Sequence, residues 1–175
     1  MQATTTTQTA LKWGAIIGVI TIIHSVIGFI FKLDPTQGTY KWIGMVIGIV
    51  VAIGGLILAM KDYKKENGGF MSYSQGLGIG ALLGGVAGLI GGVFNYFYQT
   101  FIDSSFTEKL KEMQIAAMEE RGMSSDEIDK AMEIAGMFSS PSMNIVFGIL
   151  GSIFIYFLVS LVVSAVQKNE KPIFN

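Results

Sequence analysis

The chain has 175 residues, of which 51% are hydrophobic and only 14% are charged. Soluble domains carry about 25% charged residues, so this composition favours long uncharged segments in a membrane over a soluble fold. The formal net charge is -1 and there is no cysteine, which excludes disulfides, iron–sulfur clusters and thiolate metal sites.

The N-terminal residues 1–9 are polar and rich in threonine, and we expect them to form a short disordered tail. An apolar run follows over residues 13–31. It is too long for the core of a cleavable signal peptide, so it predicts a retained first span. Further spans are predicted over residues 42–60, 75–98 and 143–166.

Three capping patterns, in which serine is followed three residues later by Glu or Gln, predict helix starts. They are Ser72 with Gln75, Ser105 with Glu108, and Ser124 with Glu127. The last two lie in a polar insert over residues 104–139, where apolar residues recur at helical spacing. Gly122 is placed to end the first helix of the insert, and Ser140 with Pro141 is expected to begin the last span.

These patterns together predict an all-α fold. It consists of a four-helix transmembrane bundle with an extramembrane amphipathic helical hairpin between the third and fourth spans. We expect residues 1–175 to form a single membrane domain.

The third predicted span carries glycine at every fourth position. These glycines are Gly76, Gly80, Gly84, Gly88 and Gly92. In lipid, small residues four apart form a groove along which another helix approaches closely. The first span has Gly14 and Gly18 at the same spacing, and the second has Gly44 and Gly48, so we expect these two spans to be the partners of the glycine row.

The same stretch contains Gly76-x-Gly78-x-x-Ala81, which matches a dinucleotide-binding fingerprint as a string. That fingerprint requires a preceding strand and a βαβ unit. Because this string lies within an apolar span, we interpret it as a helix-packing pattern and predict no cofactor.

Three polar residues of the spans are candidates for function. They are His24, Asn95 and Gln99. Ionisable residues inside a membrane are functional candidates, but His24 has no second histidine, cysteine or carboxylate in any predicted span with which to bind a metal or relay a proton. We therefore favour a neutral imidazole that bonds to a carbonyl or hydroxyl near Thr21 or Ser25, and interhelical hydrogen bonds for Asn95 and Gln99.

The predicted spans contain no Asp or Glu, which pumps and coupled transporters usually place in the bilayer. The leading hypothesis is a non-enzymatic membrane protein that acts through helix packing or partner binding. The alternative is a small transporter or channel subunit with a polar path near His24, Asn95 and Gln99. The expected partners are the lipid bilayer and either a second copy or another membrane protein; no metal, cofactor or nucleic acid is expected.

The orientation of the four spans is predicted from the lysines. An even number of spans puts both termini on one side, but each side then holds six Lys or Arg residues. Lys61, Lys64 and Lys65 lie in a short connector directly after the second span, where the positive-inside bias is strongest. We therefore expect cytoplasmic termini and an insert on the other side.

Several segments carry a resemblance to a known family. They are residues 70–76 (FMSYSQG), residues 96–103 (YFYQTFID), residues 119–128 (EERGMSSDEI) and the glycine-containing first span. With these, nearly the whole chain resembles a family of small bacterial membrane proteins known as a domain of unknown function, with four predicted transmembrane helices. Ser104 stands where the family commonly has proline. The resemblance implies a bacterial inner membrane and the four-span layout, and no catalytic residues.

Overall fold

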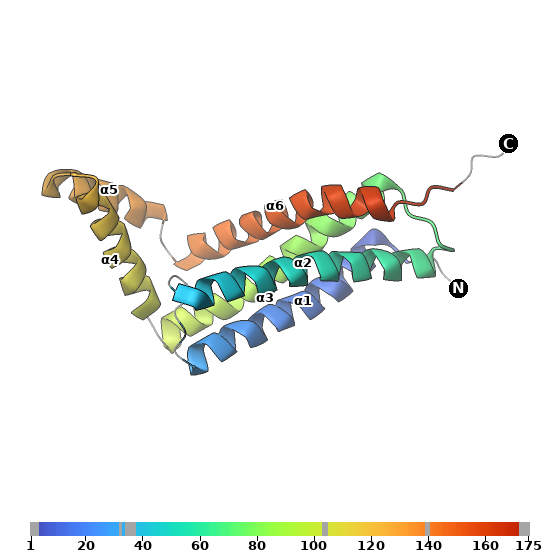
Figure 1. The fold of residues 1–175 in the computed structure, drawn as a ribbon, viewed down its shortest axis with the longest axis horizontal. Coiled ribbons are helices and arrows are strands. Elements are labelled where there is room, and N and C mark those ends of the chain that lie inside the picture. Colours follow the sequence, from blue (N-terminus) through green and yellow to red (C-terminus); the bar gives the residue numbers. More distant parts are fainter. Residues whose placement is uncertain (1–3, 32, 34–37, 103–104, 139–140, 172–175) are drawn as a thin grey trace. The chain divides into compact units, whose positions relative to one another are not determined.

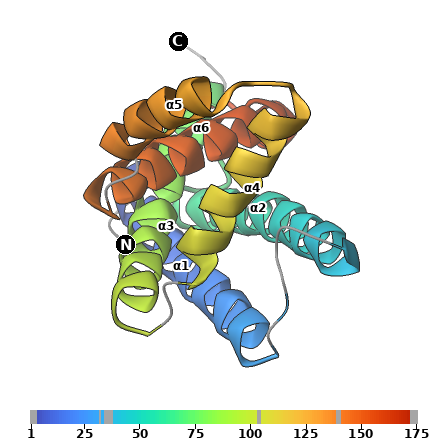
Figure 2. The same cartoon turned by 90° about the vertical axis from the view of Figure 1, so that its left-hand side faces the viewer.

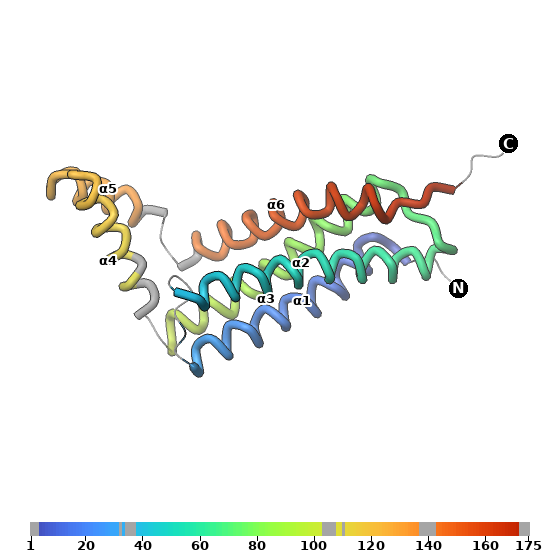
Figure 3. Tube along the Cα trace, in the orientation of Figure 1, coloured from blue at the N-terminus to red at the C-terminus, as the bar shows by residue number. Residues whose placement is uncertain are grey.

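A computed structural model describes residues 4–31, 33, 38–102, 105–138 and 141–171 (Figure 3). Side chains are described for the same residues except 105–107, 110, 137–138 and 141–142. Ser104 and Ser140, which was expected to begin the last span, lie outside the described residues, as does the side chain of Ser105.

The described chain is helical. Its helices are α1 (Thr6–Ile30), α2 (Gly38–Glu66), α3 (Tyr73–Phe101), α4 (Ser105–Glu120), α5 (Ser125–Phe138) and α6 (Pro141–Gln167) (Figure 1). Four helices, α1, α2, α3 and α6, are long and apolar enough to cross a membrane, and their most apolar windows have mean hydropathies of 2.1, 2.7, 2.0 and 2.6. The predicted all-α fold with four membrane-length helices and two helices in the insert is confirmed.

The first helix begins earlier than predicted. Thr5 and Gln8 form a capping box: the Gln8 amide donates to Thr5 Oγ1 (3.1 Å) and the Thr5 amide donates to Gln8 Oε1 (3.0 Å). Because this box supplies partners for free amides at the helix start, residues 6–12 are helical and the expectation of a tail up to residue 9 is wrong. The T-x-x-Q pattern was readable in the sequence.

The start of α3 is as predicted. The Gln75 amide donates to Ser72 Oγ (3.2 Å), and the Ser72 amide donates to Gln75 Oε1 (2.8 Å). This reciprocal pair places the beginning of the glycine-rich helix at Tyr73.

The two helices of the insert contact each other as a hairpin (Figure 2). Gly122, with φ +76°, ends α4: its amide donates to Glu119 O (2.9 Å) and the Met123 amide donates to Met118 O (3.2 Å). These two bonds form a Schellman arrangement, and the predicted helix end at Gly122 is confirmed. At the start of α5, Ile128 is buried.

The chain divides into two compact units, each described by itself. The first, called the bundle unit, contains residues 1–91 and 149–175. The second, called the insert unit, contains residues 92–148, including α4 and α5.

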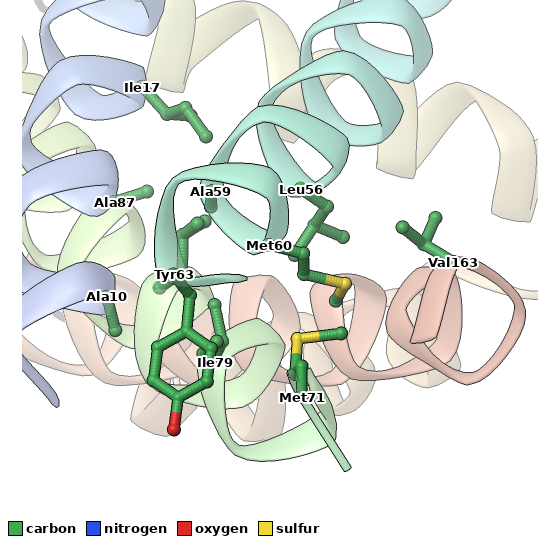
Figure 4. Close-up of a cluster of buried hydrophobic side chains, with 11 residues drawn as sticks. Ala10, Ile17, Leu56, Ala59, Met60, Tyr63, Met71, Ile79, Ala87 and Val163 are labelled. Carbon is green, nitrogen blue, oxygen red and sulfur yellow. The ribbon is translucent and has the colours of Figure 1, made fainter. Parts of the chain in front are cut away.

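The core of the bundle unit is built from all four long helices. Figure 4 shows Met60 of α2 and Met71, just before α3, pointing toward each other. The buried apolar side chains are Ala10, Ile17, Leu56, Ala59, Met60, Tyr63, Met71, Ile79, Leu83, Ala87 and Val163.

One end of the bundle unit holds both described ends of the chain. Met71 and Asn169 exchange two backbone hydrogen bonds (2.8 and 2.9 Å), and Asn67 Nδ2 donates to Thr4 O (3.0 Å). The residues before α1 and after α6 therefore both meet the connector between α2 and α3. We call this the terminal end of the bundle unit.

Candidate functional site

The glycine row of α3 faces α6 within the bundle unit. A Cβ built at Gly84 would lie 2.8 Å from both Ser152 O and Tyr156 Cβ, and one built at Gly88 would lie 2.7 Å from Ser152 Cβ. Cβ atoms at Gly76 and Gly80 would likewise collide with the side chains of Ser164 and Ser160. Only a hydrogen fits at these positions, so the row sets how closely the two helices approach.

Small residues on α6 complement the row. Ser152, Ser160 and Ser164 share its four-residue spacing, and Ser160 and Ser164 are fully buried. Ser152 Oγ donates to the carbonyl oxygen of Gly84 at 2.8 Å. A side-chain hydroxyl therefore bonds to the backbone of the neighbouring helix at the point where glycine brings the two together.

The first helix packs on another face of α3. A Cβ at Gly14 would lie 2.6 Å from Val86 Cβ, and one at Gly18 would lie 2.9 Å from Ile90 Cβ. Val86 and Ile90 each follow a glycine of the row by two residues, which turns them about 200° away on a helix. Thus α3 lies between α6 and α1.

This arrangement corrects the predicted partner of the row. The expected partners were the first and second spans, but the row contacts α6, while Gly14 and Gly18 contact the opposite face. The serines of α6 provide the small surface that the row requires. The spacing of Ser152, Ser160 and Ser164 was readable in the sequence, but the partner of the row was not predicted from it.

The remaining glycines of the predicted packing set have looser surroundings. A Cβ at Gly44 would lie 3.6 Å from His24 Nε2, whereas one at Gly48 would meet no atom of the described residues within 4 Å. Gly92 belongs to the insert unit, where its Cβ would lie 3.5 Å from Ile145 Cγ2 in ordinary contact.

His24 lies between α1 and α2, which separate toward Ile30 and Gly38 (Figure 2). Its ring stacks on Tyr40 with centroids 5.9 Å apart and an interplanar angle of 27°. His24 precedes the end of α1 by six residues, or about 9 Å of helix. The hydroxyls of Thr21 and Ser25, predicted neighbours of the imidazole, donate to carbonyls of α1 at 3.0 Å. The imidazole therefore packs against an aromatic ring of the neighbouring helix.

Asn95 and Gln99 form a hydrogen-bonded pair. Gln99 Nε2 donates to Asn95 Oδ1 at 2.9 Å, one turn apart on α3. This bond lies within a helix, whereas bonds between helices were predicted. His24 belongs to the bundle unit and this pair to the insert unit, so a polar path joining all three residues stays a prediction.

A comparison with protein families identifies the chain. The family described as "Protein of unknown function (DUF4199)" matches residues 12–169. The chain belongs to this family. No curated protein and no solved structure matches the chain. The match confirms the resemblance found in the sequence, and the four-span layout it implied agrees with four membrane-length helices.

Several hydroxyls of this family member's long helices donate to helix backbone. Besides Ser152, the hydroxyl of Ser160 donates to Phe157 O (2.7 Å). Gly76 of the fingerprint string packs against Ser164 from within α3, without the preceding strand that a dinucleotide site needs among the described residues 67–72. The described part of the chain contains no group of three His, Asp or Glu residues placed to hold a metal ion.

Proposed function

We propose that this protein is a multi-pass integral membrane protein that acts without catalysis, as a packing or partner-binding component of the membrane. The observation that carries the proposal is the contact of Gly84 with Ser152, where backbone proximity and the 2.8 Å hydrogen bond occur together. A chain whose intramembrane polar groups stabilise its own helices has the properties of a scaffold.

The first half of α2 supports the partner-binding part of the proposal. Every residue over positions 41–50 is exposed except Gly44, which is half-buried. Exposed apolar side chains thus surround this stretch, including Trp42, Val46 and Val50. In a bilayer this surface meets lipid or another protein, and a second copy or a different membrane protein is the proposed occupant.

We further propose that the membrane is a bacterial inner membrane with the termini on its cytoplasmic side. The support is the cluster of Lys61, Lys64 and Lys65 at the end of α2. Lysines that abut a span are retained on the cytoplasmic side of the membrane during insertion.

Site-specific photo-crosslinking in cells tests the partner proposal. A crosslinking residue at Val46 or Val50 should join the chain to one defined protein, or to a second copy at twice the mass. A crosslinker at Phe154, an exposed residue of α6, is the matched control. If Val46 and Val50 crosslink only to lipid, as the control position should, the chain has no partner on α2 and this part of the proposal fails.

A flux assay tests the alternative function, that of a small transporter or channel subunit. We expect proteoliposomes containing the purified chain to show no more ion or solute flux than empty vesicles. A flux that depends on His24 would favour the transporter alternative.

A further inference from the structure

Lysines gather at the terminal end of the bundle unit. They are Lys12, Lys61, Lys64, Lys65, Lys168 and Lys171, against three carboxylates, Asp62, Glu66 and Glu170. Three of the lysines have assigned contacts: Lys12 pairs with Asp62 (2.7 Å), Lys64 donates to the end of α6, and Lys171 lies over the ring of Phe70. Among the described residues, Lys61, Lys65 and Lys168 have no side-chain hydrogen bond or ion pair. We call these three the lysine rim.

The structure joins the end of α2 to the end of α6, next to which the lysine rim lies. Lys64 Nζ donates to Gln167 O (2.9 Å) and Gln167 Oε1 (3.1 Å), which joins the last turn of α2 to the last residue of α6. Asn169, just beyond, pairs with Met71 through two backbone bonds. Lys65 adjoins Lys64 and Lys168 adjoins Gln167 in the sequence, so a lysine at the end of α2 and one just beyond α6 flank this hydrogen-bonded joint.

Exposed apolar side chains lie along the same helices, just before the lysines. Leu58 is 50% exposed and precedes Lys61 and Lys65 by three and seven residues, so it shares their face of α2. On α6, Val162 and Val166 are 67% and 77% exposed. Cations beyond an apolar stretch match an amphiphile with an anionic head and hydrocarbon chains.

We propose that the lysine rim binds the phosphate headgroup of an anionic phospholipid, whose acyl chains lie along Leu58, Val162 and Val166. This inference rests on the membrane location proposed above and goes beyond it by naming a lipid class and its site. Phosphate oxygens accept hydrogen bonds from the lysine ammonium groups, and the excess of lysine over carboxylate at this end attracts the negative headgroup.

Native mass spectrometry of the full chain in mild detergent tests the proposal, with dioleoylphosphatidylglycerol and dioleoylphosphatidylcholine as probes of equal acyl chains. The anionic lipid should bind the parent protein more tightly than the zwitterionic one. Replacing Lys61, Lys65 and Lys168 together by Gln should weaken binding of the anionic lipid about a hundredfold, since each lysine contributes about fivefold. The matched control replaces Lys111, Arg121 and Lys130 of the insert, which are also exposed, and should bind as the parent does.

Three outcomes would overturn the proposal. They are equal binding of the two lipids, equal loss in the rim and control variants, and displacement of the lipid by inorganic phosphate at equal concentration. Thermal unfolding first establishes that both variants fold. If the triple rim variant does not, Lys168→Gln alone, beyond the last helix, should still weaken anionic-lipid binding about fivefold and have no effect on the zwitterionic lipid. Failure of this lipid test would leave the crosslinking result at α2 unaffected.

Discussion

At the scale of single residues, a hydrogen in place of a side chain lets the α3 backbone lie against Ser152 and Tyr156 of α6. The Gly84 carbonyl can accept from Ser152 only because no Cβ separates the two helices. Gly78, six residues earlier, has the same residue type but no atom of the described residues within 4 Å of its Cβ position. The two glycines therefore offer a matched comparison.

Gly84→Ala should lower the free energy of unfolding by about 1–3 kcal/mol, because the added methyl forces α3 and α6 apart. Gly84→Leu should lower the free energy of unfolding further, because the leucine side chain is larger. Gly78→Ala should leave stability unchanged or raise it slightly, since alanine favours a helix over glycine by about 1 kcal/mol. Thermal unfolding of the purified parent and variant proteins in detergent measures these changes in stability. Equal melting of Gly84→Ala and the parent would contradict the assigned contact.

His24→Gln should insert and fold, with a loss of stability of about 0.5–1.5 kcal/mol from the broken aromatic pair with Tyr40. Tyr40→Leu should cost at least as much, because the Tyr40 hydroxyl also packs against Gly28. Gel filtration and thermal unfolding provide the comparison. A His24→Gln protein that folds normally but loses a measured transport activity would show that His24 is functional.

At the scale of elements, short-range chemistry decides where helices begin. At the start of α5, the Ser124 backbone amide and hydroxyl both donate to the Glu127 carboxylate at 2.8 Å. The Glu127 side chain thus accepts a hydrogen bond from the Ser124 backbone amide, as in the predicted capping pattern. The Ser124 hydroxyl donates to the same carboxylate. These two bonds hold the pKa of Glu127 below its usual value.

A lowered pKa means that ionised Glu127 stabilises the start of α5 at neutral pH, and that this stabilisation is lost as the pH falls through the lowered pKa. The protection of the Ser124 amide against hydrogen exchange, measured relative to the intrinsic exchange rate at each pH, should therefore fall upon acidification in the parent protein. In Glu127→Gln, exchange should be faster at neutral pH, and the difference from the parent should vanish at low pH. A difference that persists in acid would show that charge is not the cause.

At the scale of the whole molecule, both described ends of the chain lie at the terminal end of the bundle unit, as an even number of spans requires. The proposed orientation, with this end on the cytoplasmic side, rests on the lysines near the end of α2.

A reporter active only in the periplasm should be silent when fused after Asn175 and active when inserted at Gly122, an exposed position between α4 and α5. The same fusions with a reporter active only in the cytoplasm provide the control and should give the opposite pattern. Activity of the periplasmic reporter after Asn175 would reverse the proposed orientation.

The sequence by itself determined the local features of this protein. Hydrocarbon requires every backbone group to be bonded within a helix, so apolar length alone predicts the four long helices. Ser72 with Gln75 and the left-handed Gly122 act through neighbours within three to five residues, so a linear pattern reveals them. Thr5 with Gln8 was equally local, and its pattern was overlooked because the surrounding threonines look like a polar tail.

Only the tertiary structure decided which helices meet. Every-fourth glycines show that a helix can be approached closely, but they carry no information about the neighbour, and Gly48 has the spacing without a contact among the described residues. The pairing of Gly84 with Ser152 joins positions 68 residues apart, and the α6 serines fit the row because their small side chains repeat at the same interval. A residue pattern in one helix describes the surface of that helix only. Which helix packs against it depends on the surfaces of all the helices that pack together.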